Sequence, residues 1–329
     1  MERRKLLTDG TMTSEIGLGC MSFSGFYGAT SEKEAHETLA FCLDHGLDFL
    51  DTANIYGNGI SEKIIGNFIK KTSGKFFIAT KGGIARNSQD GRRFDNRPKF
   101  LRGELENSLK RLNTDSLDLF YVHRRDPGVE IENVMETLLE FKAEGKIRGV
   151  GFSEISPTSL RRAAAIGPVD AVQSEYSLWT RSPELGLIQA CKELGASFIP
   201  FSPVGRGILT DTVPDINAFK DPDIRKNIPR FRQPNFAENL RTVTAFKRLA
   251  ADLNVPTATL SLAWVLDQAE HVIPIPGTRS ATHAAHFINA SDFKMTSEIR
   301  DKIDQVLPVG WAYGDRYSEN QWIGVERYA

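Results

Sequence analysis

Short apolar runs alternate along most of the chain with longer segments in which apolar residues recur every three or four positions. The short runs are typical of buried strands and the longer segments of amphipathic helices. Ile64, Ile65, Phe68 and Ile69, for example, fall on one helical face. This repeated alternation of strand and helix predicts a parallel sheet covered by helices.

The alternation can be counted in units. The expected strands are residues 16–21, 47–51, 76–80, 117–122, 147–151, 171–173, 198–201 and 272–275. The expected helices are residues 30–45, one starting at Ser61, 98–112, 131–144, 157–165, 183–194, 236–253, 257–268, 278–288 and 296–306. Eight strand–helix units without a linker predict an α/β protein of the (β/α)8 TIM-barrel class, forming one domain over residues 1–329. We also expect an N-terminal β-hairpin around Asp9-Gly10, extra helices, and a C-terminal loop over the barrel mouth.

Composition narrows the class of partner. Lys and Arg number 41 and Asp and Glu 42, which gives a net charge of −1. Neither nucleic acid nor an anionic membrane surface is therefore an expected partner. The cysteines are scattered, and no apolar stretch is long enough to span a bilayer, so we expect a cytoplasmic protein. The sequence shows no metal-ligand spacing, so we expect no bound metal. The sequence does not indicate an oligomeric state.

Four titratable side chains follow three successive predicted strands. Asp51 ends the second strand and Tyr56 comes shortly after it, while Lys81 follows the third strand and His123 the fourth. Because the carboxyl ends of barrel strands meet at one face, we expect these side chains to lie together. Such a group can make a proton donor.

Each of the four has an expected role. A tyrosine titrates at about 10, and a neighbouring ammonium such as that of Lys81 would lower its pKa. Asp51 could keep a buried Lys81 charged, and His123 could orient the substrate oxygen or relay the proton. A Schiff-base role for Lys81 is the rival interpretation.

Several motifs, taken in order, resemble the aldo-keto reductase family over nearly the whole chain. They are Leu18-Gly19-Cys20-Met21, Phe49-Leu50-Asp51-Thr52-Ala53 with Tyr56-Gly57, Thr80-Lys81, Leu117-Asp118-Leu119 with His123, Gly149-Val150-Gly151-Phe152-Ser153, Val172-Gln173 with Tyr176-Ser177, Ser202-Pro203-Val204-Gly205-Arg206-Gly207 and Ile275-Pro276-Gly277-Thr278. The resemblance implies that Asp51, Tyr56, Lys81 and His123 are the catalytic tetrad, with Tyr56 as general acid. It also implies reversible reduction of an aldehyde or ketone by NADPH.

The resemblance further implies a cofactor site. Its residues would be Cys20, Met21, Asp51, Ser153, Gln173, Phe201, Ser202, Val204, Arg206, Gly207, Arg279 and Ser280. In this pattern Ser153 and Gln173 bind the nicotinamide carboxamide, Phe201 stacks on the ring, and residues 202–207 follow the pyrophosphate. Arg279 and Ser280 match the positions that hold the 2′-phosphate, which favours NADPH over NADH. Two sites depart from the family pattern: Glu154 replaces an asparagine, and the pair His286-Phe287 replaces Glu-Asn.

Substrate specificity is expected to come from loops over the mouth. Aromatic walls formed by Tyr27, Trp179 and Trp311 suit a cyclic or aromatic carbonyl compound or alcohol. Arg92, Arg93 and Arg125 could attract an acidic or phosphorylated substrate. The alternatives to a reductase are a cofactor-binding regulatory subunit of a channel-like partner with little turnover, and a lyase that uses Lys81.

Overall fold

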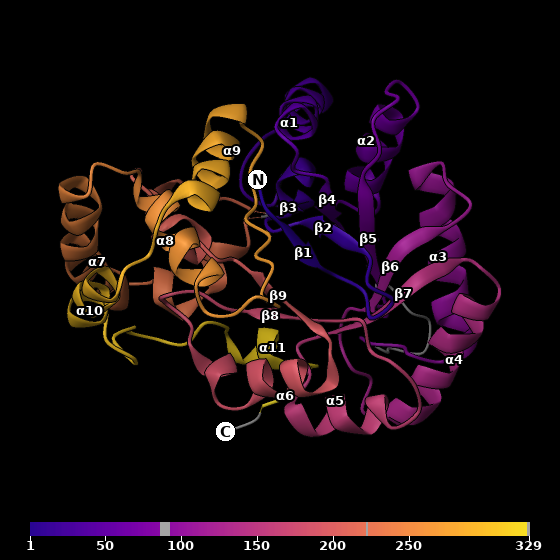
Figure 1. The fold of residues 1–329 in the computed structure, drawn as a ribbon. Helices are drawn as coiled ribbons and strands as arrows, with labels where there is room; N and C mark the ends of the chain where they lie inside the picture. The colour runs from indigo at the N-terminus through magenta and orange to yellow at the C-terminus, as the bar shows by residue number, and fades with distance from the viewer. Residues whose placement is uncertain (86–92, 222, 328–329) are drawn as a thin grey trace.

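A computed structural model describes residues 1–85, 93–221 and 223–327. Seven parallel strands form one sheet in chain order: β3 (Leu18–Gly19), β4 (Phe49–Asp51), β5 (Phe77–Gly82), β6 (Leu117–Val122), β7 (Ile147–Ser153), β8 (Ala171–Glu175) and β9 (Ser197–Phe201). Helices surround this sheet (Figure 1). The (β/α)8 barrel expected from the alternation of elements is confirmed.

The eighth expected strand, residues 272–275, differs from the prediction. It is not a continuous strand but a segment held by isolated bridges, Val272 with Phe198, Ile275 with Phe201, and Gly277 with Gly19. Pro274 and Pro276 lack the N–H that a regular ladder needs, and this explains the interruption. Their carbonyls still accept from Gly17 N and Gly19 N, both at 2.9 Å. The segment therefore closes the barrel between β9 and β3.

An antiparallel hairpin precedes the barrel. Its strands are β1 (Arg3–Lys5) and β2 (Met12–Ser14), on either side of the expected turn at Asp9-Gly10. Leu6 and Leu7 follow β1 and pack with the barrel-filling side chains Phe49, Phe77 and Leu119. The hairpin thus contributes to the packed interior, opposite the strand ends that carry the titratable side chains.

The helices match the expected positions closely. They are α1 (Glu32–Asp44), α2 (Ile60–Ile69), α3 (Pro98–Leu112), α4 (Ile131–Ala143), α5 (Pro157–Ala164), α6 (Leu187–Leu194), α7 (Asn235–Asp252), α8 (Thr257–Leu266), α9 (Ala281–Ile288), α10 (Ser297–Val306) and α11 (Glu319–Trp322). Ser31 and Glu34 form the capping box that starts α1. The helix expected at 183–194 is instead a 3-10 turn, Ser182–Glu184, followed by α6, because Gly186 adopts φ 114° between them.

Helices α1 and α9 lie side by side, which brings the start of the chain against its last third (Figure 1).

Within the described ranges, no single helix is long and apolar enough to cross a membrane. Helices α7 and α8 meet that test only as a pair bent by 91°.

Candidate active site

Asp51 and Lys81 form a buried ion pair at the mouth of the barrel. Asp51 ends β4, and Lys81 lies within β5. Because side chains two apart on a strand share a face, Asp51 faces inward with Phe49, and Lys81 faces inward with Ala79. Lys81 Nζ donates to Asp51 Oδ1 and, at 2.8 Å, to the Thr52 carbonyl. Gln173 Nε2 donates to the other Asp51 oxygen at 2.8 Å. The carboxylate is thus held by two strands besides its own.

Tyr56 and His123 lie over this ion pair. Lys81 Nζ is 5.5 Å from the centre of the Tyr56 ring, and the Tyr56 and His123 rings are 6.1 Å apart in an edge-on arrangement. Phe26 contacts the Tyr56 ring edge-on at 6.3 Å. The structure therefore brings together all four side chains that the strand ends predicted.

The electrostatics of Tyr56 differ from the expectation. Burial, followed by the negative charge of Asp51, raises the pKa of Tyr56 well above its usual value, whereas Lys81 was expected to lower it. The ammonium of Lys81 is bound to Asp51, which offsets its effect on the phenol. Burial also lowers the pKa of Lys81, and Asp51 counteracts this. Tyr56 consequently keeps its proton at neutral pH and can donate it.

The expected pyrophosphate segment is a tight turn after β9. Ser202, Gly205, Arg206 and Gly207 all have positive φ, between 52° and 101°. Such a turn can present successive backbone N–H groups to an anion. Phe201 and Ser202 are half-buried beside it, and Val204 is buried.

One arginine lies within this turn and a second lies beside it, and only the first is expected from the sequence. The Arg206 guanidinium is buried and bound to Glu175 at 2.6 Å, so its charge is already neutralised. Arg225, which the sequence reasoning missed, donates to the Arg206 carbonyl at 3.3 Å and lies over the Tyr27 ring at 5.0 Å. Arg225 lies in an irregular polar stretch, and no local sequence pattern indicates that this stretch contacts the turn.

Arg279 and Ser280 lie where the last barrel segment leads into α9. Ser280 caps the helix by accepting from His283 N, and Arg279 is half-buried, with Nη1 donating to the Tyr27 carbonyl at 2.9 Å. A cation beside a helix N-terminus suits a phosphate. Met21 is half-buried at the start of the loop that carries Tyr27, whereas the side chain of Cys20 lies fully in the core.

Glu154, the departure from the family pattern, has a partner far along the chain. Its carboxylate is 1% exposed and accepts from Arg316 Nη2 at 2.6 Å, from Arg316 Nη1 at 3.2 Å, from Ser174 Oγ at 3.0 Å and from Glu175 N at 2.9 Å. Chiefly the charge of Arg316 lowers the pKa of Glu154 to about 2, against the opposing effect of burial. Glu154 thus anchors the C-terminal tail, residues 308–327, to the barrel.

The expected aromatic walls divide into two groups. Tyr27 is half-buried and its hydroxyl faces Arg206 Nη1 at 3.5 Å. Trp179 and Trp311 are buried and stack on each other with ring centres 6.1 Å apart, and Trp311 Nε1 donates to the Leu178 carbonyl. This stack joins the tail to the loop after β8, whereas Tyr27 borders the predicted cofactor segment.

The expected basic groups are also divided. Arg92 lies outside the described residues, Arg93 donates to Asn320 Oδ1 at 2.6 Å, and Arg125 is paired with Glu326 at 3.3 Å. Arg124, which the sequence reasoning passed over, instead lies close enough for its charge to act on Tyr56. Its position directly after His123 was the available signal.

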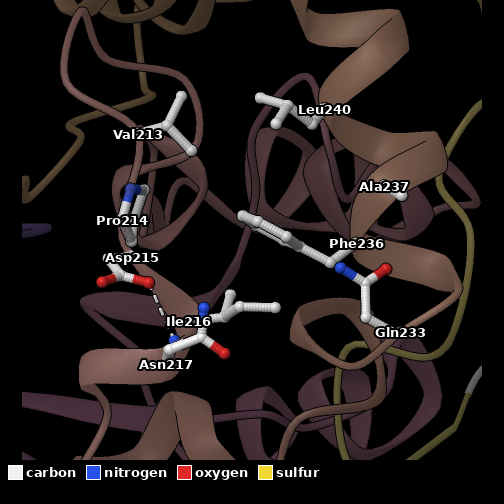
Figure 2. A pocket seen from close by; sticks show the side chains of 9 residues that line it. All are labelled: Val213, Pro214, Asp215, Ile216, Asn217, Gln233, Phe236, Ala237 and Leu240. Carbon is white, nitrogen blue, oxygen red and sulfur yellow. Dashed lines mark hydrogen bonds between the residues drawn. The ribbon is translucent and has the colours of Figure 1, made fainter.

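A separate hollow of about 350 Å³ lies between the loop at residues 213–217 and α7 (Figure 2). Phe236 and Leu240 reach into it from the helix, and Asp215 on the facing loop accepts from Asn217 N. None of the four clustered side chains lines this hollow. The hollow is therefore separate from the cluster of Asp51, Tyr56, Lys81 and His123 at the barrel mouth.

Comparisons with known proteins agree with this geometry. The sequence profile described as "Aldo/keto reductase family" matches residues 15–308. The chain is 37% identical over 308 residues to "Aldo-keto reductase yakc [NADP(+)]" of Schizosaccharomyces pombe, covering 91% of each protein. It is 36% identical over 320 residues to "Probable aldo-keto reductase 1" of Glycine max, covering 95% of this chain and 91% of that one. Among solved structures, glycerol dehydrogenase from Gluconobacter oxydans superposes with a TM-score of 0.83 at 27% identity, covering 93% of this chain and 94% of that one.

Proposed function

The chain belongs to the aldo/keto reductase family, and we propose that it is an NADPH-dependent oxidoreductase that reduces an aldehyde or ketone to the alcohol, reversibly. The observation that carries this proposal is the buried Asp51–Lys81 pair beneath a protonated Tyr56, with His123 at its edge. NADPH rather than NADH is supported by the position of Arg279 beside Ser280, and by the NADP(+) in the name of the Schizosaccharomyces pombe relative.

Specific residues suit the cofactor. The half-buried Phe201 could stack on the nicotinamide. Ser153 ends β7 and lies in register with Gln173 of the neighbouring strand β8, so the two side chains could bind the carboxamide. The turn at residues 202–207 and Arg279 would hold the phosphates. When bound, NADPH supplies a hydride to a carbonyl carbon.

The protein's own groups handle the proton. Tyr56 donates its phenolic proton to the carbonyl oxygen, and an oriented acid of this kind contributes about 10²- to 10⁴-fold to the rate. As the phenolate forms, the Lys81 ammonium, 5.5 Å from the centre of the Tyr56 ring, offsets the opposing charge of Asp51. Asp51 keeps that ammonium charged during the step. His123 would orient the substrate oxygen.

The two alternative functions make different demands on these residues. A Schiff-base lyase needs an accessible amine, but the Lys81 side chain has no exposed surface and is bound to Asp51 and to the Thr52 carbonyl. A regulatory subunit needs only the cofactor site and would bind NADPH without turnover.

The test is NADPH oxidation in the presence of a reactive aldehyde such as 4-nitrobenzaldehyde. The wild-type protein should oxidise NADPH, and Tyr56→Phe should lose about 100-fold or more of kcat while binding NADPH with unchanged affinity. Tyr121→Phe is a matched control, because Tyr121 is a buried tyrosine whose ring also lies 5.5 Å from Lys81 Nζ. Tight NADPH binding without turnover across a carbonyl panel would overturn the reductase in favour of the regulatory subunit.

A further inference from the structure

Arg124 places a cation at the mouth of the barrel, two residues beyond the end of β6. Its guanidinium donates to three neutral acceptors: the His123 carbonyl at 3.0 Å, Ser153 Oγ at 3.3 Å and the Tyr317 hydroxyl at 3.3 Å. Two of these contacts are long for hydrogen bonds. The geometry relates this cation to the proposed proton donor: Arg124 donates to the carbonyl of His123, and the His123 ring lies edge-on to the Tyr56 ring with centres 6.1 Å apart. The charge of Arg124 also acts on Tyr56.

The other arginines around the mouth are mostly neutralised by acids. Such ion pairs join Arg206 to Glu175 at 2.6 Å, Arg316 to Glu154 at 2.6 Å, Arg225 to Asp223 at 2.7 Å and Arg125 to Glu326 at 3.3 Å. Within the described ranges, Arg124 has no carboxylate at ion-pair distance. It is half-buried, so part of its hydration is lost. The charge of Arg124 also helps to lower the pKa of Glu154, but that carboxylate lies beyond ion-pair distance and is bound to Arg316 at 2.6 Å.

The cofactor's phosphates do not account for this cation. They are assigned above to the turn at residues 202–207 and to Arg279. If Ser153 binds the nicotinamide carboxamide, it exchanges Arg124 for that group, and Arg124 then loses one of its neutral partners. A planar guanidinium left in this state matches a carboxylate or phosphate, which it can bind through two parallel hydrogen bonds.

We propose that Arg124 binds an anionic group of the substrate, a carboxylate or a phosphate ester, so that the physiological substrate is an acidic carbonyl compound. This inference rests on the proposed reductase function and specifies its substrate class. Charge-assisted pairs of this kind contribute about 10- to 100-fold to binding. Arg124 therefore determines specificity, while Tyr56 performs the proton transfer for any carbonyl.

The test compares carbonyl compounds that differ in one charge, using NADPH-loaded protein. Succinic semialdehyde is paired with butanal, and glyceraldehyde 3-phosphate with glyceraldehyde. The wild-type kcat/KM should favour the anionic member of at least one pair, and which pair distinguishes carboxylate from phosphate. In Arg124→Gln the anionic-to-neutral ratio of that pair should fall by about 10- to 100-fold, mainly through KM. Arg124→Lys, which keeps a point charge, should recover part of the ratio.

Two control variants separate specificity from other effects. Arg148→Gln also removes one positive charge, but near the start of β7, at the end of the barrel away from the mouth, where Arg148 pairs with Asp118. This variant should leave the anionic-to-neutral ratio unchanged. Tyr317→Phe removes one acceptor of Arg124 without removing its charge. If Arg124 only supported the tail, Tyr317→Phe and Arg124→Gln would both slow the two members of each pair equally.

Three results would overturn the inference. They are a wild-type enzyme that favours the neutral member of both pairs, an anionic-to-neutral ratio in Arg124→Gln within about fivefold of wild type, and equal losses on both members. Turnover of the neutral aldehydes would in each case leave the reductase function standing. Absence of turnover with every carbonyl would instead refute the reductase, and the substrate class with it.

Discussion

The ion pair between Glu154 and Arg316 gives a prediction whose size can be worked out in two ways. Glu154→Gln keeps the side-chain volume but removes the charge, and it leaves the 6%-exposed Arg316 with Glu175 at 3.6 Å as its remaining acid. Breaking a buried ion pair from one side costs about 3–5 kcal/mol. Separately, a carboxyl whose pKa falls from 4.5 to about 2 on folding contributes about 3 kcal/mol. We expect Glu154→Gln to lower the free energy of unfolding by about this amount at pH 7.

The pH dependence tests the cause of this loss. Because the folded state lowers the pKa of Glu154, the wild-type stabilisation is complete above the unfolded value of 4.5 and disappears as the pH falls toward about 2. The difference between wild type and Glu154→Gln should therefore shrink between pH 5 and pH 2.5 in urea unfolding followed by tryptophan fluorescence. The surface variant Glu132→Gln, whose partner Arg162 is exposed, should barely move the midpoint.

A double-mutant cycle completes this experiment. If the pair acts as a unit, adding Arg316→Gln to Glu154→Gln should cost much less than the sum of the single changes. A loss below about 1 kcal/mol at pH 7, or a loss that stays constant down to pH 2.5, would refute the account of Glu154 as the buried anchor of the tail.

Two other predictions concern the cofactor end and the packing of the barrel. Arg279→Ala should raise the Kd for NADPH by at least tenfold and leave that for NADH within about twofold, measured by nucleotide fluorescence, because the NADPH 2′-phosphate loses a charged partner; equal effects would show that Arg279 does not hold this phosphate. In an exposed helix, Gly→Ala would raise the free energy of unfolding by about 1 kcal/mol. Gly66→Ala should instead lower the Tm in thermal unfolding. An added Cβ would overlap the Arg111 carbonyl oxygen, and an unchanged or raised Tm would contradict this close approach of α2 to the end of α3.

Local sequence signals located most of the barrel. The predicted bounds of α3 and β6 match those of the structure, because each element depends on residues a few positions apart. The apolar run at residues 272–275 predicts a regular strand, but the missing N–H groups of Pro274 and Pro276 interrupt the ladder there.

The site was predictable where strand ends carry it and not where distant segments meet. Asp51, Lys81 and His123 converge because the barrel brings successive strand ends together. Glu154 and Arg316 are 162 positions apart, and the Arg206–Glu175 pair also depends on packing between separate loops. The raised pKa of Tyr56 is likewise a result of burial, which the spacing of charged residues does not reveal.

The central claim is that the chain transfers hydride from NADPH to a carbonyl carbon with Tyr56 as the acid. The most direct measurement uses NADPH carrying deuterium at the transferred C4 position, with 4-nitrobenzaldehyde in a single turnover followed by mass spectrometry. The account predicts deuterium on the alcohol carbon, formed about 100-fold or more slowly by Tyr56→Phe at equal NADPH occupancy. Alcohol without deuterium, or equal rates for the two proteins, would contradict it.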